Sequence, residues 1–219
     1  MIRVLHRILD LLYPPKCTFC RELREDLVQG ICLKCKKDLP YTKNGGSLKG
    51  NFFTACVSPL YYEDDVREAM LRYKFYGLTS YSSSFGVLIA SCADEYIDRQ
   101  VDIISWVPLS RRRLRHRGYD QAQLIAEQVA VRLGLPCRPL LRKVRHTKKQ
   151  SKTGSADKRK ANVSGAYAVI DGQDVSGKTI LLIDDIVTTG ATFSECARTL
   201  GMAGAERVYC AAVARKRKD

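Results

Sequence analysis

The architecture of this chain can be worked out from one segment, Gly177-Lys178-Thr179-Ile180-Leu181-Leu182-Ile183-Asp184-Asp185-Ile186-Val187-Thr188-Thr189-Gly190-Ala191-Thr192. An apolar, β-branched run leads into two adjacent carboxylates, then into a loop of hydroxyls and glycine, and then into a segment with helical periodicity. This order predicts a buried strand, a loop and a helix. Open α/β sheets bind ligands where their parallel strands end, so Asp184 and Asp185 should lie at the ligand edge.

The chemistry of the segment follows from the same order. Two neighbouring carboxylates can accept hydrogen bonds from two neighbouring hydroxyls of a ribose. The loop behind them offers backbone N–H groups and hydroxyls to an anion at a helix N-terminus, and Gly190 allows close approach of the backbone. The pattern predicts a ribose 5-phosphate site. The alternative is an ordinary buried strand followed by a capped helix, with Asp184 and Asp185 as turn residues.

A second motif overlaps the first. Residues 172–179 have the letters of a P-loop, G-x-x-x-x-G-K-T. A P-loop opens a helix directly after its Lys-Thr pair, whereas Thr179 begins an apolar, β-branched run that is typical of a strand. We therefore interpret residues 171–177 as turns between strands.

Residues 180–192 resemble the phosphoribosyl-pyrophosphate (PRPP) loop of type I phosphoribosyltransferases. In that family the acidic pair holds the ribose and the Thr/Gly loop holds the 5-phosphate. The resemblance implies that Asp184 and Asp185 are catalytic. It also implies that PRPP is bound by Asp184, Asp185, Val187, Thr188, Thr189, Gly190, Ala191 and Thr192.

An arginine-dense loop is the second informative place. Residues 102–107 read as a buried strand, and the loop that follows carries Arg and His up to Gly118. Such a density of positive charge at the ligand edge favours an anion, and guanidinium groups match phosphate oxygens bidentately. The sequence predicts a pyrophosphate site formed by Pro108, Leu109, Ser110, Arg111 and Arg112. The alternative is that several of these arginines are merely solvated, and His116 is better explained as a solvated neighbour than as a base.

Length and composition fit one ordinary domain with a small addition. The 219 residues include 37 Lys and Arg against 23 Asp and Glu, a net charge of +14, which indicates polyanionic partners such as phosphates or nucleic acid. No apolar run is long enough to span a bilayer, and the charged N-terminal stretch is unlike a secretory signal. We expect a cytoplasmic protein with residues 1–50 and residues 51–219 as its two parts.

Two CxxC pairs lie near the N-terminus, with residues 21–31 between them. This spacing brings four thiolates to one tetrahedral zinc ion, and four protein ligands make such a site structural. Zinc would supply on the order of 10 kcal/mol of folding free energy to a module with almost no core. The alternative is buried free thiols. The predicted ligands are Cys17, Cys20, Cys32 and Cys35.

The rest of the chain alternates between strands and helices. We expect an amphipathic helix over residues 2–12, a polar Gly-rich connector over 40–51 and a strand over 55–62. Helices should cover 84–98, 121–133 and 190–202, with a last strand over 207–214 and a solvated basic tail. Residues 138–160, rich in Lys and Arg, predict a mobile basic flap that grips phosphates. The flap has few aromatic residues to stack bases, which weakens the case for single-stranded DNA.

The whole pattern resembles the ComF family of competence proteins, including its GntX-like members. The resemblance rests on the CxxC pairs and on residues 71–74, 108–121, 147–150, 159–162 and 184–185. It implies an α/β phosphoribosyltransferase-type parallel sheet flanked by helices, with a small N-terminal four-cysteine zinc module. It also implies structural Zn²⁺, Mg²⁺ with PRPP, and a role in the uptake of transforming DNA. Two departures are Asp120, where the family usually has Asn, and the absence of a leucine in residues 151–155.

The implied partners are PRPP, single-stranded DNA and other competence proteins such as a DNA-translocating ATPase, with membrane association only through partners. If the chain is an active enzyme, it transfers a 5-phosphoribosyl group to an unknown base. Only residues 193–219 follow the PRPP loop, which leaves no C-terminal hood for that base. Two alternatives remain: a nucleobase-salvage or amidophosphoribosyl transferase, and a DNA-binding scaffold without catalysis.

Overall fold

A computed structural model describes residues 15–97, 101–145 and 163–217. Its centre is a parallel sheet in the order β1 (Ala55–Val57), β7 (Arg207–Arg215), β6 (Thr179–Val187) and β3 (Ile103–Trp106). The short strand β2 (Leu60–Tyr61) pairs with the later part of β7, also in parallel. The predicted α/β class with a parallel sheet is confirmed.

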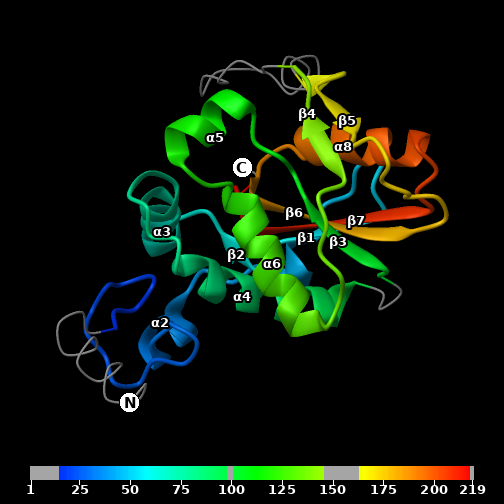
Figure 1. Cartoon of the computed structure of the whole chain (residues 1–219). Coiled ribbons are helices and arrows are strands. Elements are labelled where there is room, and N and C mark those ends of the chain that lie inside the picture. The colour runs from blue at the N-terminus through cyan, green and yellow to red at the C-terminus, as the bar shows by residue number, and fades with distance from the viewer. Residues whose placement is uncertain (1–14, 98–100, 146–162, 218–219) are drawn as a thin grey trace.

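Helices cover both faces of the sheet (Figure 1). Leu181 and Ile183 of β6 belong to the hydrophobic cluster under α4 (Tyr81–Tyr96) and α6 (Gln121–Leu133). The alternate residues Ile180 and Leu182 belong to the cluster under α8 (Ala191–Met202). Because side chains alternate across a strand, a strand buried on both faces needs the continuous apolar run seen in the sequence.

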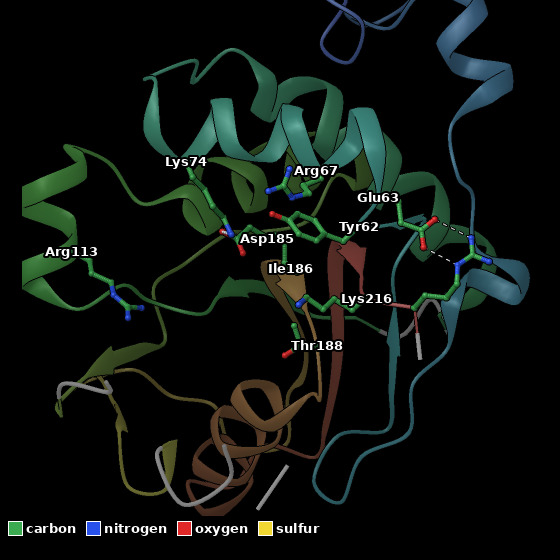
Figure 2. Close-up of a pocket in the computed structure, with 10 residues that line it drawn as sticks. Tyr62, Glu63, Arg67, Lys74, Arg113, Asp185, Ile186, Thr188 and Lys216 are labelled. Atoms are coloured by element: carbon green, nitrogen blue, oxygen red, sulfur yellow. Dashed lines mark hydrogen bonds and ion pairs between the residues drawn. The ribbon is translucent and has the colours of Figure 1, made fainter. Parts of the chain in front are cut away.

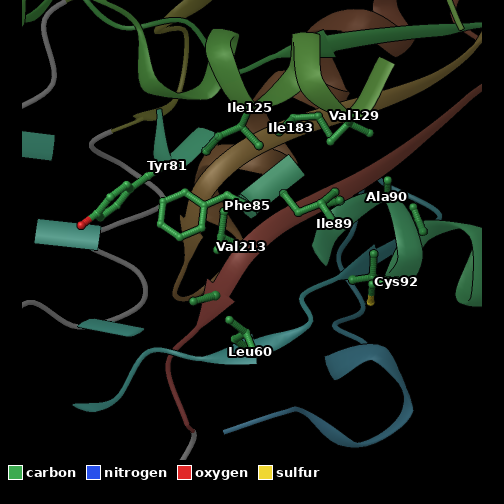
Figure 3. Packing of buried hydrophobic residues seen from close by; sticks show 14 of the residues in the cluster. Leu60, Tyr81, Phe85, Ile89, Ala90, Cys92, Ile125, Val129, Ile183 and Val213 are labelled. Atoms are coloured by element: carbon green, nitrogen blue, oxygen red, sulfur yellow. The ribbon is translucent and has the colours of Figure 1, made fainter. Parts of the chain in front are cut away.

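Helices α4 and α6 pack tightly together over the sheet. Phe85 and Ile89 of α4 lie with Ile125 and Val129 of α6 above Ile183 (Figure 3). A Cβ atom on Gly86 would lie 2.4 Å from the Cβ of Gln128, so only glycine allows this approach of the two helices. The packing fixes α6, whose N-terminus lies beside the predicted pyrophosphate loop.

The four-cysteine module is joined to this core. It contains α2 (Leu33–Asp38), and Phe19, which is 1% exposed, packs edge-on against Phe85 with ring centroids 6.1 Å apart. The predicted connector is also packed: it forms the 3-10 helix η1 (Lys43–Gly46), in which Gly45 and Gly46 are buried. Arg215 donates from Nη1 to the carbonyl of Gly46 at 2.7 Å, which ties the connector to the end of β7. The division into residues 1–50 and 51–219 stays a prediction.

Several predicted boundaries differ from the structure. The strand predicted over 55–62 is broken between β1 and β2 at Ser58-Pro59, because proline has no N–H for a strand ladder. It leads into α3 (Asp64–Phe75), and α4 begins before the predicted start at 84. The arginine-dense loop forms the short helix α5 (Arg111–Arg117), capped by Ser110 and ended by Gly118 in the left-handed conformation.

Part of the predicted flap is also ordered. The strand β4 (Leu141–Lys143) pairs antiparallel with β5 (Tyr167–Val169), and Leu140 and Leu141 are buried. Residues 146–160 of the predicted flap lie outside the described residues, as does the helix predicted over 2–12. Within the described ranges, the structure contains no helix with the length and apolar character needed to cross a bilayer.

Candidate functional site

The two carboxylates lie near the carboxyl end of β6, as the sequence predicts. Alternation along the strand turns Asp185 toward the face of α3, where its Oδ2 lies 2.8 Å from Nζ of Lys74 (Figure 2). Asp184 accepts a hydrogen bond at Oδ1 from the backbone N–H of Asp185 at 2.8 Å. Both carboxylates line one cavity of about 260 Å³, together with Lys74.

The environment of Asp184 favours its protonated form. Burial raises its pKa to about 8, because it disfavours the charged carboxylate, and the neighbouring charge of Asp185 acts in the same direction. The Lys74 ammonium opposes these effects. A cation or a hydroxyl-bearing ligand at this pair would therefore meet one carboxylate that is paired and one that readily holds a proton.

The loop after β6 carries the anion-binding geometry. Gly190 has a φ of 75°, which favours glycine. A Cβ atom there would also lie 3.0 Å from Cδ2 of Leu48, so space at this position favours glycine as well. The N-cap residue of α8, Gly190, has no side chain to cap the helix, and Thr189 accepts at Oγ1 from the N–H of Ala191 at 3.4 Å. The next N–H groups of this turn have no intrahelical acceptor. Thr192 in this turn lines the same cavity as the carboxylates. Such a helix start binds phosphate or carboxylate groups.

The segment after β3 forms the opposite wall. Pro108 and Leu109 line the cavity, and Ser110 is buried as the cap of α5. Asp120 holds this wall in place: its Oδ2 accepts from the N–H of Leu109 at 2.8 Å, and its Oδ1 accepts from the N–H of Ala122 at 3.1 Å. One carboxylate thus caps α6 and anchors the loop.

The arginines divide by helical position. Arg111 and Arg112 are exposed on α5 and do not line the cavity, whereas Arg113 and Arg117 do. These two are four residues apart and therefore share one helix face. Once the segment is recognised as a helix from Ser110 and Gly118, that spacing is the signal that would have selected them.

Two further residues were missed by the sequence interpretation. Lys143 lines the cavity and donates from Nζ to the hydroxyl of Tyr167 at 3.0 Å, across the β4–β5 pair. Burial lowers the pKa of Lys143, and the positive charge of Arg113 lowers it further. The apolar pair Leu140-Leu141 was the available signal that this part of the chain is a strand and not a polar flap.

The predicted zinc ligands come together. One thiol each from Cys17, Cys20, Cys32 and Cys35 lies within 4.8 Å of the others. Backbone N–H groups donate to two of them, from Cys32 to Sγ of Cys17 and from Cys35 to Sγ of Cys32, both at 3.4 Å. Four sulfur donors in one cluster fit a structural zinc ion.

Helix α3 connects this module to the carboxylates. Arg72 donates from Nη2 to the carbonyls of Thr18 and Phe19 at 3.1 and 2.7 Å. Two residues further along the helix, Lys74 pairs with Asp185. The zinc module and the ligand edge are therefore in contact with the same helix turn.

Comparison with known proteins agrees with both parts of the structure. Residues 120–219 match the family described as a phosphoribosyl transferase domain, and residues 8–46 match the double zinc ribbon domain. The fold and the cavity thus define a phosphoribosyltransferase-type domain joined to a zinc ribbon.

Curated relatives identify the family. Competence protein ComFC of Bacillus subtilis is 30% identical over 191 residues, covering 84% of this chain and 70% of the relative. Competence protein F of Haemophilus influenzae is 25% identical over 222 residues, covering 91% and 96%. The DNA utilization protein YhgH of Salmonella typhi is 36% identical over 112 residues, covering 50% and 48%. The chain belongs to the ComF family of competence proteins, as the sequence resemblance implied. These relatives do not favour the salvage-enzyme or scaffold interpretations.

Proposed function

We propose that this protein binds PRPP with Mg²⁺ in the cavity at the carboxyl edge of the sheet. The observation that carries the proposal is the meeting of three features in one cavity: the carboxylate pair, the first turn of α8 and the 107–109 segment. A sugar diol, a phosphate and a pyrophosphate are the chemical groups that these features recognise. PRPP contains all three in one molecule.

Each part of PRPP has an assigned contact. The 5-phosphate lies on Val187, Thr188, Thr189, Gly190, Ala191 and Thr192, and the ribose on Asp184 and Asp185. The pyrophosphate lies against Pro108, Leu109 and the start of α5 at Ser110, with Arg113, Arg117 and Lys143 in place of the exposed Arg111 and Arg112 as the cations that line the cavity. The carboxylate oxygens of Asp184 and Asp185 fit Mg²⁺, because this ion prefers hard oxygen ligands. It usually binds through one or two carboxylates plus substrate phosphates. When bound, Mg²⁺ neutralises charge on the departing pyrophosphate.

In a transfer reaction, the chain's own residues would stabilise the charges that develop. Loss of pyrophosphate leaves positive charge on the ribose carbon, which the Asp185 carboxylate would stabilise, joined by Asp184 once it has released its proton. The arginines and Lys143 stabilise the opposite charge on the leaving group. The acceptor would have to approach the ribose carbon from the side away from pyrophosphate.

The biological role that we propose is the handling of transforming DNA. Its support is the family: the two relatives with the widest coverage are named competence proteins. The net charge of +14 suits a polyanion as a partner. Single-stranded DNA and a DNA-translocating ATPase are the proposed partners. The proposed site of action is the cytoplasm, with membrane association through partners only.

The first experiment is calorimetric titration of PRPP with Mg²⁺ into the wild type and into the Asp184→Asn/Asp185→Asn double variant. We expect binding by the wild type and its loss in the variant. Asp171→Asn is the matched control, because the Asp171 side chain is 95% exposed and lies on the β5–β6 connection. Equal binding by all three proteins, or none by the wild type, would overturn the proposed site.

A further inference from the structure

A second, larger cavity opens on the other side of Asp185. It has a volume of about 830 Å³ and shares Lys74, Arg113 and Asp185 with the smaller cavity described above. Its own walls come from the start of α3 and from the residues that follow β7 (Figure 2). The first residues of the predicted solvated tail, Lys216 and Arg217, are exposed and also line this cavity.

Backbone hydrogen bonds fix these walls. The N–H of Lys216 donates to the carbonyl of Val187 at 3.2 Å, and the N–H of Tyr62 donates to the carbonyl of Arg215 at 2.8 Å. These bonds extend the sheet beyond its strands and keep both side chains at the cavity. Figure 2 shows the Lys216 side chain reaching between Ile186 and Thr188, with the Tyr62 ring above it.

The charges around this cavity do not cancel. Its two acids are already paired, Asp185 with Lys74 at 2.8 Å and Glu63 with Arg217 through two bonds at 2.8 and 3.0 Å. Arg67 donates from Nη1 to the neighbouring Glu68. Among the described residues, no carboxylate pairs with the ammonium of Lys216; Arg113 has no such pair either, but it is assigned to pyrophosphate in the proposed function. Positive charge is therefore left over on a concave surface, which focuses it on a bound anion.

The shape adds a second requirement. Tyr62 supplies an aromatic face and Ile186 an apolar side chain, and the ring and the cations lie in one cavity. An aromatic face favours a planar ring by stacking, and Lys216 and Arg67 favour a negatively charged substituent. A neutral nucleobase would leave the Lys216 ammonium without a partner, whereas Arg67 already pairs with Glu68 through Nη1.

We propose that this cavity is the acceptor pocket, and that it takes a planar heteroaromatic ring bearing a carboxylate or a phosphate. The proposal rests on the proposed PRPP site, because Asp185 lies on the wall that the two cavities share. In the transfer, the lone pair of a ring nitrogen forms the bond to the ribose carbon; a pyridine-type nitrogen carries no proton, and an N–H nitrogen releases its proton to solvent. The bond from that carbon to the pyrophosphate oxygen breaks, and its electron pair leaves with pyrophosphate.

The test is titration of small rings into the full chain after saturation with Mg²⁺ and PRPP. Nicotinate and orotate represent the carboxylate source, pyridoxine 5′-phosphate the phosphate source, and adenine and uracil the neutral rings. We expect one of the anionic probes to bind at least tenfold more tightly than the neutral rings. In Lys216→Met and Arg67→Met we expect that affinity to fall about tenfold each, about 1.4 kcal/mol. PRPP affinity should change less than threefold.

The control is Arg207→Met, which removes an exposed cation from the opposite, amino end of β7. It should leave every affinity unchanged. Titration of PRPP alone separates the two proposals: if PRPP does not bind, the proposed function fails before the pocket is tested. If PRPP binds and no anionic ring does, or if neutral rings bind equally well, the acceptor proposal is overturned. It is also overturned if Lys216→Met weakens the binding of a single-stranded oligonucleotide and leaves the binding of every ring unchanged.

Discussion

The Lys74 ammonium and the Asp185 carboxylate meet at 2.8 Å, with side chains only 16% and 15% exposed. The pair joins helix α3 to the end of β6 and neutralises one of two adjacent carboxylates. Because both groups are largely withdrawn from water, removing one partner leaves the other charge poorly solvated.

We expect Lys74→Met to lower the free energy of unfolding by about 1–3 kcal/mol, since a buried partner is left unpaired. Urea denaturation at pH 7 measures it. The Lys74→Met/Asp185→Asn double variant should recover most of the loss, because the unpaired charge is gone. If the two single changes simply add, the pair does not contribute to stability.

The raised pKa of Asp184 predicts a pH dependence of stability. The folded carboxyl holds its proton up to about pH 8, whereas the unfolded one releases it near pH 4. The folded state therefore binds more protons between these values, and the free energy of unfolding falls as pH rises through that window, by at most about 1.4 kcal/mol per pH unit.

Asp184→Asn should remove most of this slope in the ligand-free protein. Urea denaturation of both proteins at pH 5, 6, 7 and 8 provides the comparison, with Asp171→Asn as an exposed control. Parallel curves for the wild type and Asp184→Asn would show that the carboxyl of Asp184 ionises normally in the folded protein.

The sequence predicted the parts of the fold that depend on local pattern. The apolar run before Asp184 could be assigned to a buried parallel strand, and α6 has the predicted bounds because Asp120 and Gly134 cap it at either end. The clustering of the four cysteines could also be predicted, because the spacing of two CxxC pairs is enough to indicate one shared metal ion.

The missed features depend on tertiary contacts. Lys74 reaches Asp185 only because α3 is held against the zinc module and the sheet. Lys216 lies in a basic tail that reads as solvated, and only the hydrogen bond from its N–H to Val187 places it at a cavity. Local periodicity cannot predict such pairings between residues that are distant in the chain.

Asp120 gives the next prediction. Both of its oxygens accept backbone hydrogen bonds, so Asp120→Asn turns one acceptor into a donor. Because asparagine caps helices as well as aspartate does, its oxygen should keep the cap of α6 and the bond to Leu109 should be lost. We expect a loss of about 1 kcal/mol of stability and faster hydrogen exchange at the Leu109 amide.

Asp120→Ser is the matched comparison. The serine hydroxyl can still cap α6 but is too short to bond Leu109 as well, so exchange at Leu109 should rise while α6 stays protected. Unchanged exchange at Leu109 in both variants would mean that the loop is held by other contacts.

Zinc removal should affect the main domain as well as the four-cysteine module. Phe19 packs on Phe85 of α4, and Arg72 of α3 donates to the carbonyls of Thr18 and Phe19. Loss of the metal would release these carbonyls and expose an aromatic face of the core. We expect a chelator to lower the Tm of the whole protein in one transition and to increase hydrogen exchange in α4.

Arg72→Met tests the same connection without removing the metal. It should retain one zinc ion per chain and yet lower the Tm, because two carbonyl contacts are lost. Arg24→Met is the control, since Arg24 pairs with the neighbouring Glu22 at the surface of the module. If chelation instead melted the module in a separate transition and left α4 protected, the two parts would be energetically independent. The position of Lys74 beside Asp185 would then not depend on the zinc ion.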